Sequence, residues 1–243
     1  MRMRLETDFS AEDLAKKTRK SLDFVQTQCD KLVKAGVIRT RVRSGVLCYY
    51  YPIWVPGIME GILSNREQCD AHPELGACFE EYTRIRVGML APMLGNGVNF
   101  MRVMPVMSAI ENDTHKASYD EISTLIEKAW AISVGPCSCR RSRRLMGEGC
   151  GHLEEDICIA VGDMATYAIE TNKARPATRE EVMEILQRAE ENGFVHQITN
   201  IDGEDKILGI CNYCVCSCYA LCTSQLFNTP NMSASAYCAH VDP

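Results

Sequence analysis

Eight of the fourteen cysteines of this chain fall into two short stretches. They are Cys137, Cys139, Cys150 and Cys158, followed by Cys211, Cys214, Cys216 and Cys218. The second stretch holds four thiols within eight residues, a density that a hydrophobic core does not need. Tetrahedral thiolate sites need it, whether for zinc or for the irons of a cubane cluster. The pattern therefore predicts two metal centres.

A disulfide scaffold is the alternative use for so many cysteines. The N-terminal sequence has no apolar h-region of a signal peptide. The longest apolar stretch, from Tyr49 to Met59, is interrupted by Pro52 and Pro56 and is too short to cross a membrane. We therefore expect a cytoplasmic protein that is not inserted in a membrane. A reducing compartment favours metal or redox use of the thiols.

The N-terminal segment is basic although the whole chain has a net charge of −6. Residues 16–45 carry nine basic and two acidic side chains, a local charge of +7. Ser10 and Ser21 are placed to begin two helices, and Gly36 to end the second. Residues 37–43 and 46–51 can form two strands joined at Ser44-Gly45. This order resembles a winged helix-turn-helix, which we assign to residues 1–55.

Three arginines would share one face of the first strand of that hairpin, namely Arg39, Arg41 and Arg43. Residues two apart in a strand point the same way, so all three could meet the phosphates of DNA. The alternative is a solvated basic face that docks a partner protein.

Residues 56–117 are expected to form a mostly helical connecting region. Residues 73–93 favour a helix, Gly95-Asn-Gly97 a turn, and Phe100 to Met107 a strand. No phosphate-binding loop and no dinucleotide fingerprint occurs in the chain, so no motif supports ATP or NAD binding.

Residues 118–243 are expected to form a compact cysteine-rich domain. Predicted helices cover residues 119–130, 162–171 and 179–192, and predicted strands cover 131–134 and 194–197. An extended Cys137-Ser-Cys139 would point both thiols the same way, and glycines around Cys150 would let the backbone approach a metal core. Cys158 would lie just before a helix and Cys211 in a turn.

Within this domain several motifs are similar to those of a known family. They are Val134-Gly-Pro-Cys137-Ser-Cys139-Arg, Gly149-Cys150-Gly-His152, Cys158 with its following helix, Ala189 to His196, Ile210-Cys211-Asn212 with the three later cysteines, Ser235-Ala-Tyr and Val241-Asp242. This half of the chain resembles the 4Fe-4S ferredoxin-type iron–sulfur proteins of anaerobes. The resemblance implies cluster binding and electron transfer beside larger oxidoreductases. An electron carrier without a flavin or a substrate site needs partners, so we also expect an oligomer.

The chain departs from that family at two points. Tyr213 and Ser217 stand where relatives often have cysteine. Relatives also continue past the Val-Asp segment into a ferredoxin module with C-x2-C-x2-C spacing, whereas the sequence here ends at Pro243.

Spacing alone leaves the ligand sets open. The simpler assignment is one [4Fe–4S] cluster for each cysteine run, and a mixed assignment takes two thiolates from each run. Cys222 is a reserve ligand, and two zinc ions are the alternative to clusters.

Other side chains near the cysteines could tune a cluster. Arg140 and Arg141 follow the first cysteine pair, and their positive charge would favour the reduced state. The alternative is a solvated basic loop. His152 and His196 are either structural hydrogen-bonding residues or replacements for a cysteine on iron.

The sequence thus predicts an α+β chain whose function is cytoplasmic electron transfer through about two [4Fe–4S] clusters. It favours a component of a larger oxidoreductase system over a self-contained enzyme, and it suggests no catalytic residue. The alternatives are a redox- or iron-responsive winged-helix DNA-binding regulator and a structural zinc protein.

Overall fold

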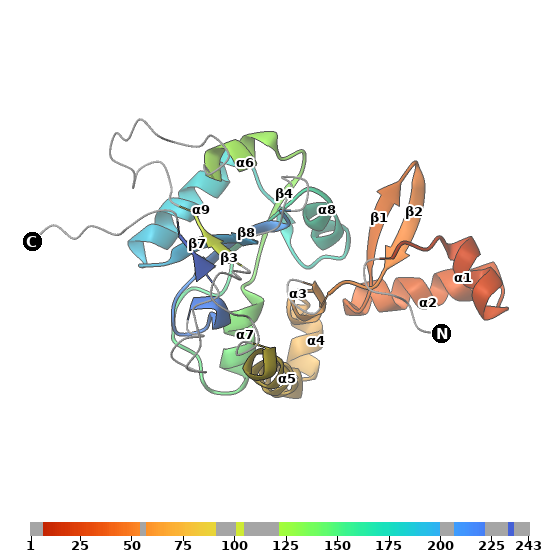
Figure 1. Cartoon of the computed structure of the whole chain (residues 1–243), viewed down its shortest axis with the longest axis horizontal. Coiled ribbons are helices and arrows are strands. Elements are labelled where there is room, and N and C mark those ends of the chain that lie inside the picture. The colour runs from red at the N-terminus through yellow and green to blue at the C-terminus, as the bar shows by residue number, and fades with distance from the viewer. Residues whose placement is uncertain are drawn as a thin grey trace, which may run out of the picture.

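The computed structural model describes residues 7–53, 57–90, 101–104, 122–199, 207–221 and 233–235. Helices and strands are mixed within these ranges, as the expected α+β class requires. Figure 1 shows an N-terminal unit of two helices and a hairpin beside a body built around one sheet. The predicted turn at Gly95–Gly97 and the reserve ligand Cys222 lie outside the described residues.

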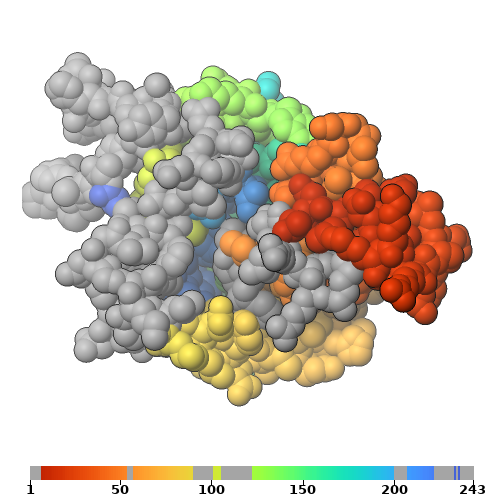
Figure 2. All heavy atoms as spheres, turned by 45° about the vertical axis from the view of Figure 1, so that its right-hand side comes forward, coloured from red at the N-terminus to blue at the C-terminus, as the bar shows by residue number. Residues whose placement is uncertain are grey.

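The N-terminal unit follows the order expected from its sequence. It contains α1 (Ala11–Thr18), α2 (Leu22–Ala35), β1 (Arg39–Arg43) and β2 (Val46–Tyr50). Ser10 and Asp13 form a capping box at α1, and the Ser21 side chain caps α2. β1 and β2 pair antiparallel, and a small core with Leu14, Val25 and Cys29 holds helices and hairpin together. Figure 2 shows this unit as a lobe at the side of the molecule.

Four helices pack together at one end of the body. They are α3 (Met59–Leu63), α4 (Arg66–Ala71), α5 (Glu74–Leu90) and α7 (Ser138–Leu145). Helix α5 agrees with the predicted helix as far as Leu90. The helical connecting region therefore packs against the start of the cysteine-rich segment.

The N-terminal unit meets this end of the body at two glycines. Gly36 ends α2 with a φ of +85°, and its backbone lies directly against Gly61 of α3. A Cβ on Gly36 would lie 2.1 Å from Gly61 O, far inside contact distance.

Gly36→Ala is therefore expected to destabilise the protein by about 3 kcal/mol, since it adds a clash to an unfavourable φ. Gly45→Ala is the matched control, because Gly45 has a φ of +78° and open space around it. It should cost about 1 kcal/mol. Urea unfolding of both variants measures the difference, and equal losses would contradict the close contact.

The described strands of the body form one sheet in the order β6-β4-β5-β8-β7-β3-β9. They are β3 (Met101–Val103), β4 (Ile132–Gly135), β5 (Cys158–Val161), β6 (Arg175–Pro176), β7 (Val195–Thr199), β8 (Gly209–Tyr213) and β9 (Ser233–Ala234). Neighbours are antiparallel except β3 and β9. β4 and β7 match two predicted strands, and β3 falls within a third.

Three more helices complete the body, namely α6 (Ile122–Lys128), α8 (Gly162–Glu170) and α9 (Arg179–Glu191). Thr178 caps α9, which buries Val182, Ile185, Leu186 and Ala189 as its spacing predicts. Helix α8 packs on β4 and β5 and also touches β1 of the N-terminal unit.

Two local predictions in the cysteine-rich segment are wrong. Cys137 is the N-cap of α7 and Cys139 lies in its first turn, so this segment is not extended. Cys211 lies in strand β8 rather than in a turn. Cys158 does lie just before helix α8, and it begins strand β5, which was not predicted. A three-residue alternation cannot distinguish a strand from a helix start, and both missed strands are short.

None of the helices in the described ranges has the length and apolar character that crossing a bilayer requires.

Candidate metal centres

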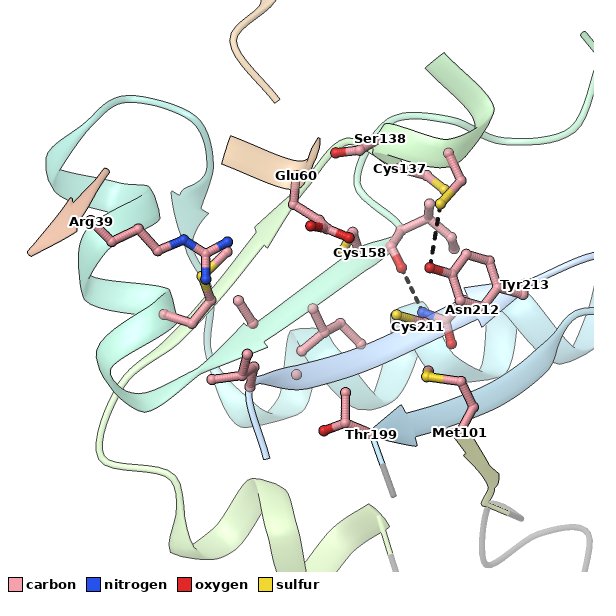
Figure 3. Close-up of a pocket in the computed structure, with 17 residues that line it drawn as sticks. Arg39, Glu60, Met101, Cys137, Ser138, Cys158, Thr199, Cys211, Asn212 and Tyr213 are labelled. Carbon is pink, nitrogen blue, oxygen red and sulfur yellow. Dashed lines mark hydrogen bonds between the residues drawn. The ribbon is translucent and has the colours of Figure 1, made fainter. Parts of the chain in front are cut away.

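Four of the predicted ligands line a single cavity of about 90 Å³, namely Cys137, Cys139, Cys158 and Cys211. We call this the four-thiol pocket, and Figure 3 shows its lining residues. Cys137 and Cys139 come from the start of α7, Cys158 from β5 and Cys211 from β8. The pocket therefore forms only when the helix start and both strands are in place.

Sheet register places the two strand cysteines together. Ile159 pairs with Ile210, and Cys158 and Cys211 are the next residues beyond that pair. The α7 cysteines are positioned by the backbone, because Cys137 N donates to Glu154 O at 2.7 Å. The positive end of the α7 dipole also favours thiolates at this position.

The thiols of the pocket differ in acidity. A hydrogen bond from the Cys139 thiol, reinforced by the charge of Arg140, overcomes burial and lowers the pKa of Cys137 to about 7. The hydrogen bond with Cys137 raises the pKa of Cys139, and the hydrogen bond with Cys211 raises the pKa of Cys158. A metal binds the thiolate form of cysteine, so metal binding in this pocket would release the thiol protons.

Tyr213 and Asn212 also line the pocket, although cysteine spacing predicts neither as a ligand or a tuning group. Tyr213 Oη lies 3.5 Å from Cys139 Sγ, and burial raises the pKa of this tyrosine, so it remains a neutral hydroxyl. Asn212 Nδ2 donates to Ile157 O at 2.6 Å. The sequence pointed to Tyr213 only through its place where relatives often have cysteine.

His196 has a structural role beside this pocket. It is buried, and its Nδ1 lies 2.6 Å from Asn212 Oδ1. Burial lowers the pKa of His196, so the neutral ring donates this hydrogen bond and helps to fix β8 beside β7. His152 is exposed and makes an edge-on contact with the Phe194 ring, with centroids 5.4 Å apart.

A second group combines Cys150, Cys214 and Cys216, whose sulfur atoms all lie within 4.8 Å of one another. We call it the three-thiol group. Cys150 Sγ and Cys214 Sγ are 3.8 Å apart. Burial acts to raise the pKa of Cys214, but the Ser217 hydroxyl and the Arg140 guanidinium outweigh it and lower the pKa to about 7. Cys218 is buried one turn further on, with its N–H directed at Cys214 O.

The two groups do not follow the two cysteine runs. Cys211 of the second run joins three thiols of the first, and Cys150 of the first run joins two of the second. This grouping differs from both predicted assignments, the one with a single centre for each run and the one in which each centre takes two thiols from each run. The reason is the pairing of β5 with β8, which places Cys211 at the first run, while the Gly-rich loop carries Cys150 away from it.

Arg140 lies close to both groups and is 3% exposed. Burial acts to lower its pKa, but the charges of Cys137 and Cys214 outweigh this and raise it. Its Nη2 donates to Asn212 O at 3.0 Å, and its guanidinium lies 4.2 Å from the centre of the Phe194 ring. The alternative of a solvated basic loop is therefore wrong at this position.

Arg141 is buried as well, but carboxylates neutralise its charge. It donates to Glu154 at 2.9 Å and to Glu155 at 2.8 Å, with a third bond to Leu63 O. It ties α7 to α3 and to the loop before β5. Of the two arginines predicted to tune a cluster, Arg140 is the one whose charge faces thiols.

The three arginines of the predicted basic face of β1 are not equally accessible to DNA. Arg39 is 2% exposed, donates to Gly57 O at 2.7 Å and lines the four-thiol pocket, so it cannot reach DNA. Arg41 pairs with Asp8 at 2.7 Å and lies over the Tyr50 ring. Arg43, with a side chain 53% exposed, remains accessible. The face is divided because β1 packs against α8.

The spacing of the sulfur atoms bears on the kind of metal. Zinc with tetrahedral bonds of about 2.3 Å sets its sulfur ligands about 3.8 Å apart. Among the described residues, the three-thiol group is the one whose three sulfur atoms all lie within 4.8 Å of one another, and its Cys150–Cys214 pair is at 3.8 Å. In the four-thiol pocket the sulfur atoms lie in two hydrogen-bonded pairs, Cys137 with Cys139 and Cys158 with Cys211.

None of the protein-family models, curated proteins or solved structures compared with this chain matches it.

Proposed function

We propose that this protein is a cytoplasmic iron–sulfur electron carrier that serves a larger oxidoreductase system. One [4Fe–4S] cluster would be held by Cys137, Cys139, Cys158 and Cys211, and a second centre by the three-thiol group. The observation that carries the proposal is the convergence of four thiols from one helix start and two strands on one cavity. Four thiolates around a cavity are the ligand set of a cubane cluster, which supplies a one-electron couple when bound.

Several residues of the chain suit this role. Arg140 supplies a buried positive charge beside both thiol groups, which offsets the negative charge of thiolates and of an added electron. Tyr213 offers a hydroxyl to Cys139. The apolar wall of Ile157 and Ile159 limits the access of water to the pocket.

A redox titration of the anaerobically reconstituted protein tests the proposal, with dithionite as reductant and electron paramagnetic resonance as the readout. We expect a reversible couple at low potential. The absence of reducible iron after reconstitution would reject the proposed function.

Tyr213→Phe is expected to lower the potential of the cluster in the four-thiol pocket by about 40 mV. A hydrogen bond to a thiolate stabilises the reduced state, and losing about 1 kcal/mol of such stabilisation corresponds to this shift for one electron. Tyr82→Phe, at an exposed tyrosine of α5, is the control. Equal potentials in Tyr213→Phe and the unaltered protein would show that this hydroxyl does not act on the cluster.

A second candidate function is a DNA-binding regulator that responds to the state of the cluster. The observation that favours it is Arg39, which belongs to the hairpin of the N-terminal unit and lines the four-thiol pocket. A change of charge in the pocket would act directly on the strand that also carries the exposed Arg43.

The test is fluorescence anisotropy with duplex DNA at low and high salt, in the oxidised and reduced protein. The regulator requires salt-dependent binding that changes with the oxidation state and weakens in Arg43→Gln. No binding at low salt would leave electron transfer as the proposed function.

A further inference from the structure

A second cavity, of about 670 Å³, lies beside α7. Its lining includes Arg140, Cys150 and His152, together with charged residues of α4, α7 and the loop before β5. The volume falls in the range typical of small-molecule sites. We call it the Arg140 cavity.

Most of the charges around this cavity neutralise one another. Four arginines and three carboxylates line it, a net formal charge of +1. Arg66 pairs with Glu155 at 2.7 Å, and Arg144 with Glu154 at 2.7 Å. Arg141 pairs with both of these glutamates.

Arg140 is the exception. It is 3% exposed, and its Nε and Nη1 are buried and donate to no oxygen or nitrogen among the described residues. Its Nη2 is occupied by Asn212 O. A buried guanidinium is costly unless an anion meets it, and the groups that act on this one are thiols of the two proposed centres, the Cys214 thiol through a hydrogen bond.

Cys150 connects the cavity to the three-thiol group. It lines the cavity, and its sulfur lies 3.8 Å from Cys214 Sγ. An anion on the guanidinium of Arg140 would therefore lie next to the three close thiols of this group.

We infer that the Arg140 cavity binds a small carboxylate or inorganic oxyanion, with Arg140 as its principal cation and the three-thiol group beside it. This inference rests on the proposed function only in so far as the neighbouring thiols hold a metal centre. The anion would accept hydrogen bonds from the Arg140 nitrogens that meet no oxygen or nitrogen, and it would be close enough to perturb that centre.

Calorimetric titration of the whole protein with acetate and with inorganic phosphate, at constant ionic strength, tests the inference. We expect saturable binding of at least one of the two, weakened at least tenfold in Arg140→Gln and less in Arg140→Lys, which keeps the charge. Preference between the two probes distinguishes a carboxylate site from an oxyanion site. Arg144→Gln is the matched control, since Arg144 lines the same cavity but is 55% exposed and paired with Glu154.

Saturable binding that is equal in the unaltered protein and Arg140→Gln would overturn the inference, as would the absence of binding by both probes. Thermal unfolding of each variant shows whether it is folded. If Arg140→Gln does not fold, the comparison of Arg140→Lys with the unaltered protein still tests the inference. The titration needs no iron, so failure of the anion site and failure of cluster binding are separate results. In the reconstituted protein, the bound anion should alter the paramagnetic spectrum, and Arg140→Gln should abolish this change.

Discussion

Cys211→Ala is expected to abolish the same metal centre as Cys158→Ala, although the two residues belong to different cysteine runs. Both thiols line the four-thiol pocket from neighbouring strands. If that pocket holds one of two cubane clusters, either substitution should remove about four of about eight irons. Cys214→Ala should instead remove the centre at the three-thiol group and leave the other in place. Iron and sulfide content with the paramagnetic spectrum of each variant provides the measurement.

Cys69→Ala is the control for these variants, because Cys69 is buried in α4 and lies in neither thiol group. It should keep both centres. The grouping would be contradicted if Cys211→Ala and Cys214→Ala lost the same signal while Cys158→Ala lost the other, since that pattern is the one expected for a centre per run.

Gly209→Ala is expected to destabilise the fold by about 3 kcal/mol or more and to empty the four-thiol pocket. A Cβ on Gly209 would lie 2.1 Å from Ile159 O, a backbone atom of the paired strand β5. Because the clash is with backbone, relief requires β5 and β8 to separate, and these strands carry Cys158 and Cys211. Urea unfolding and iron content after reconstitution test both parts.

Gly193→Ala is the matched substitution for this experiment. Gly193 has a φ of +70° and nothing within 4 Å of an added Cβ, so only the conformational cost of about 1 kcal/mol applies. It should keep its iron. A Gly209→Ala protein as stable as Gly193→Ala would contradict the close β5–β8 pairing.

Local signals were sufficient to predict parts of this fold. Ser10, Ser21 and Thr178 cap helices by hydrogen bonds to residues three positions on, so the sequence nearby contains the whole interaction. Gly36 ends α2 for an equally local reason, its positive φ. The hairpin of β1 and β2 was predictable because a two-residue turn joins its strands.

The partition of the thiols was not predictable in this way. It depends on β5 pairing with β8 across about fifty residues, and no local pattern encodes that register. The burial of Arg39 has the same origin, since the ring 5.5 Å from its guanidinium belongs to Tyr167 of α8. The spacing of the cysteines indicated that they bind metal, but only the pairing of strands distant in sequence determines which thiols lie together.

The surroundings of individual side chains were harder still to predict. Arg140 and Arg141 are neighbours of the same type, yet one faces thiols and the other carboxylates. They differ because successive positions on a helix point about 100° apart, and only the packing of α7 determines what each meets.

The most direct test of the central claim is the iron, acid-labile sulfide and zinc content of the anaerobically purified protein, with its paramagnetic spectrum after dithionite reduction. We predict about eight irons with matching sulfide per chain and a fast-relaxing signal from the reduced protein. Two zinc ions per chain with no sulfide and no signal would contradict the account and make this a structural zinc protein.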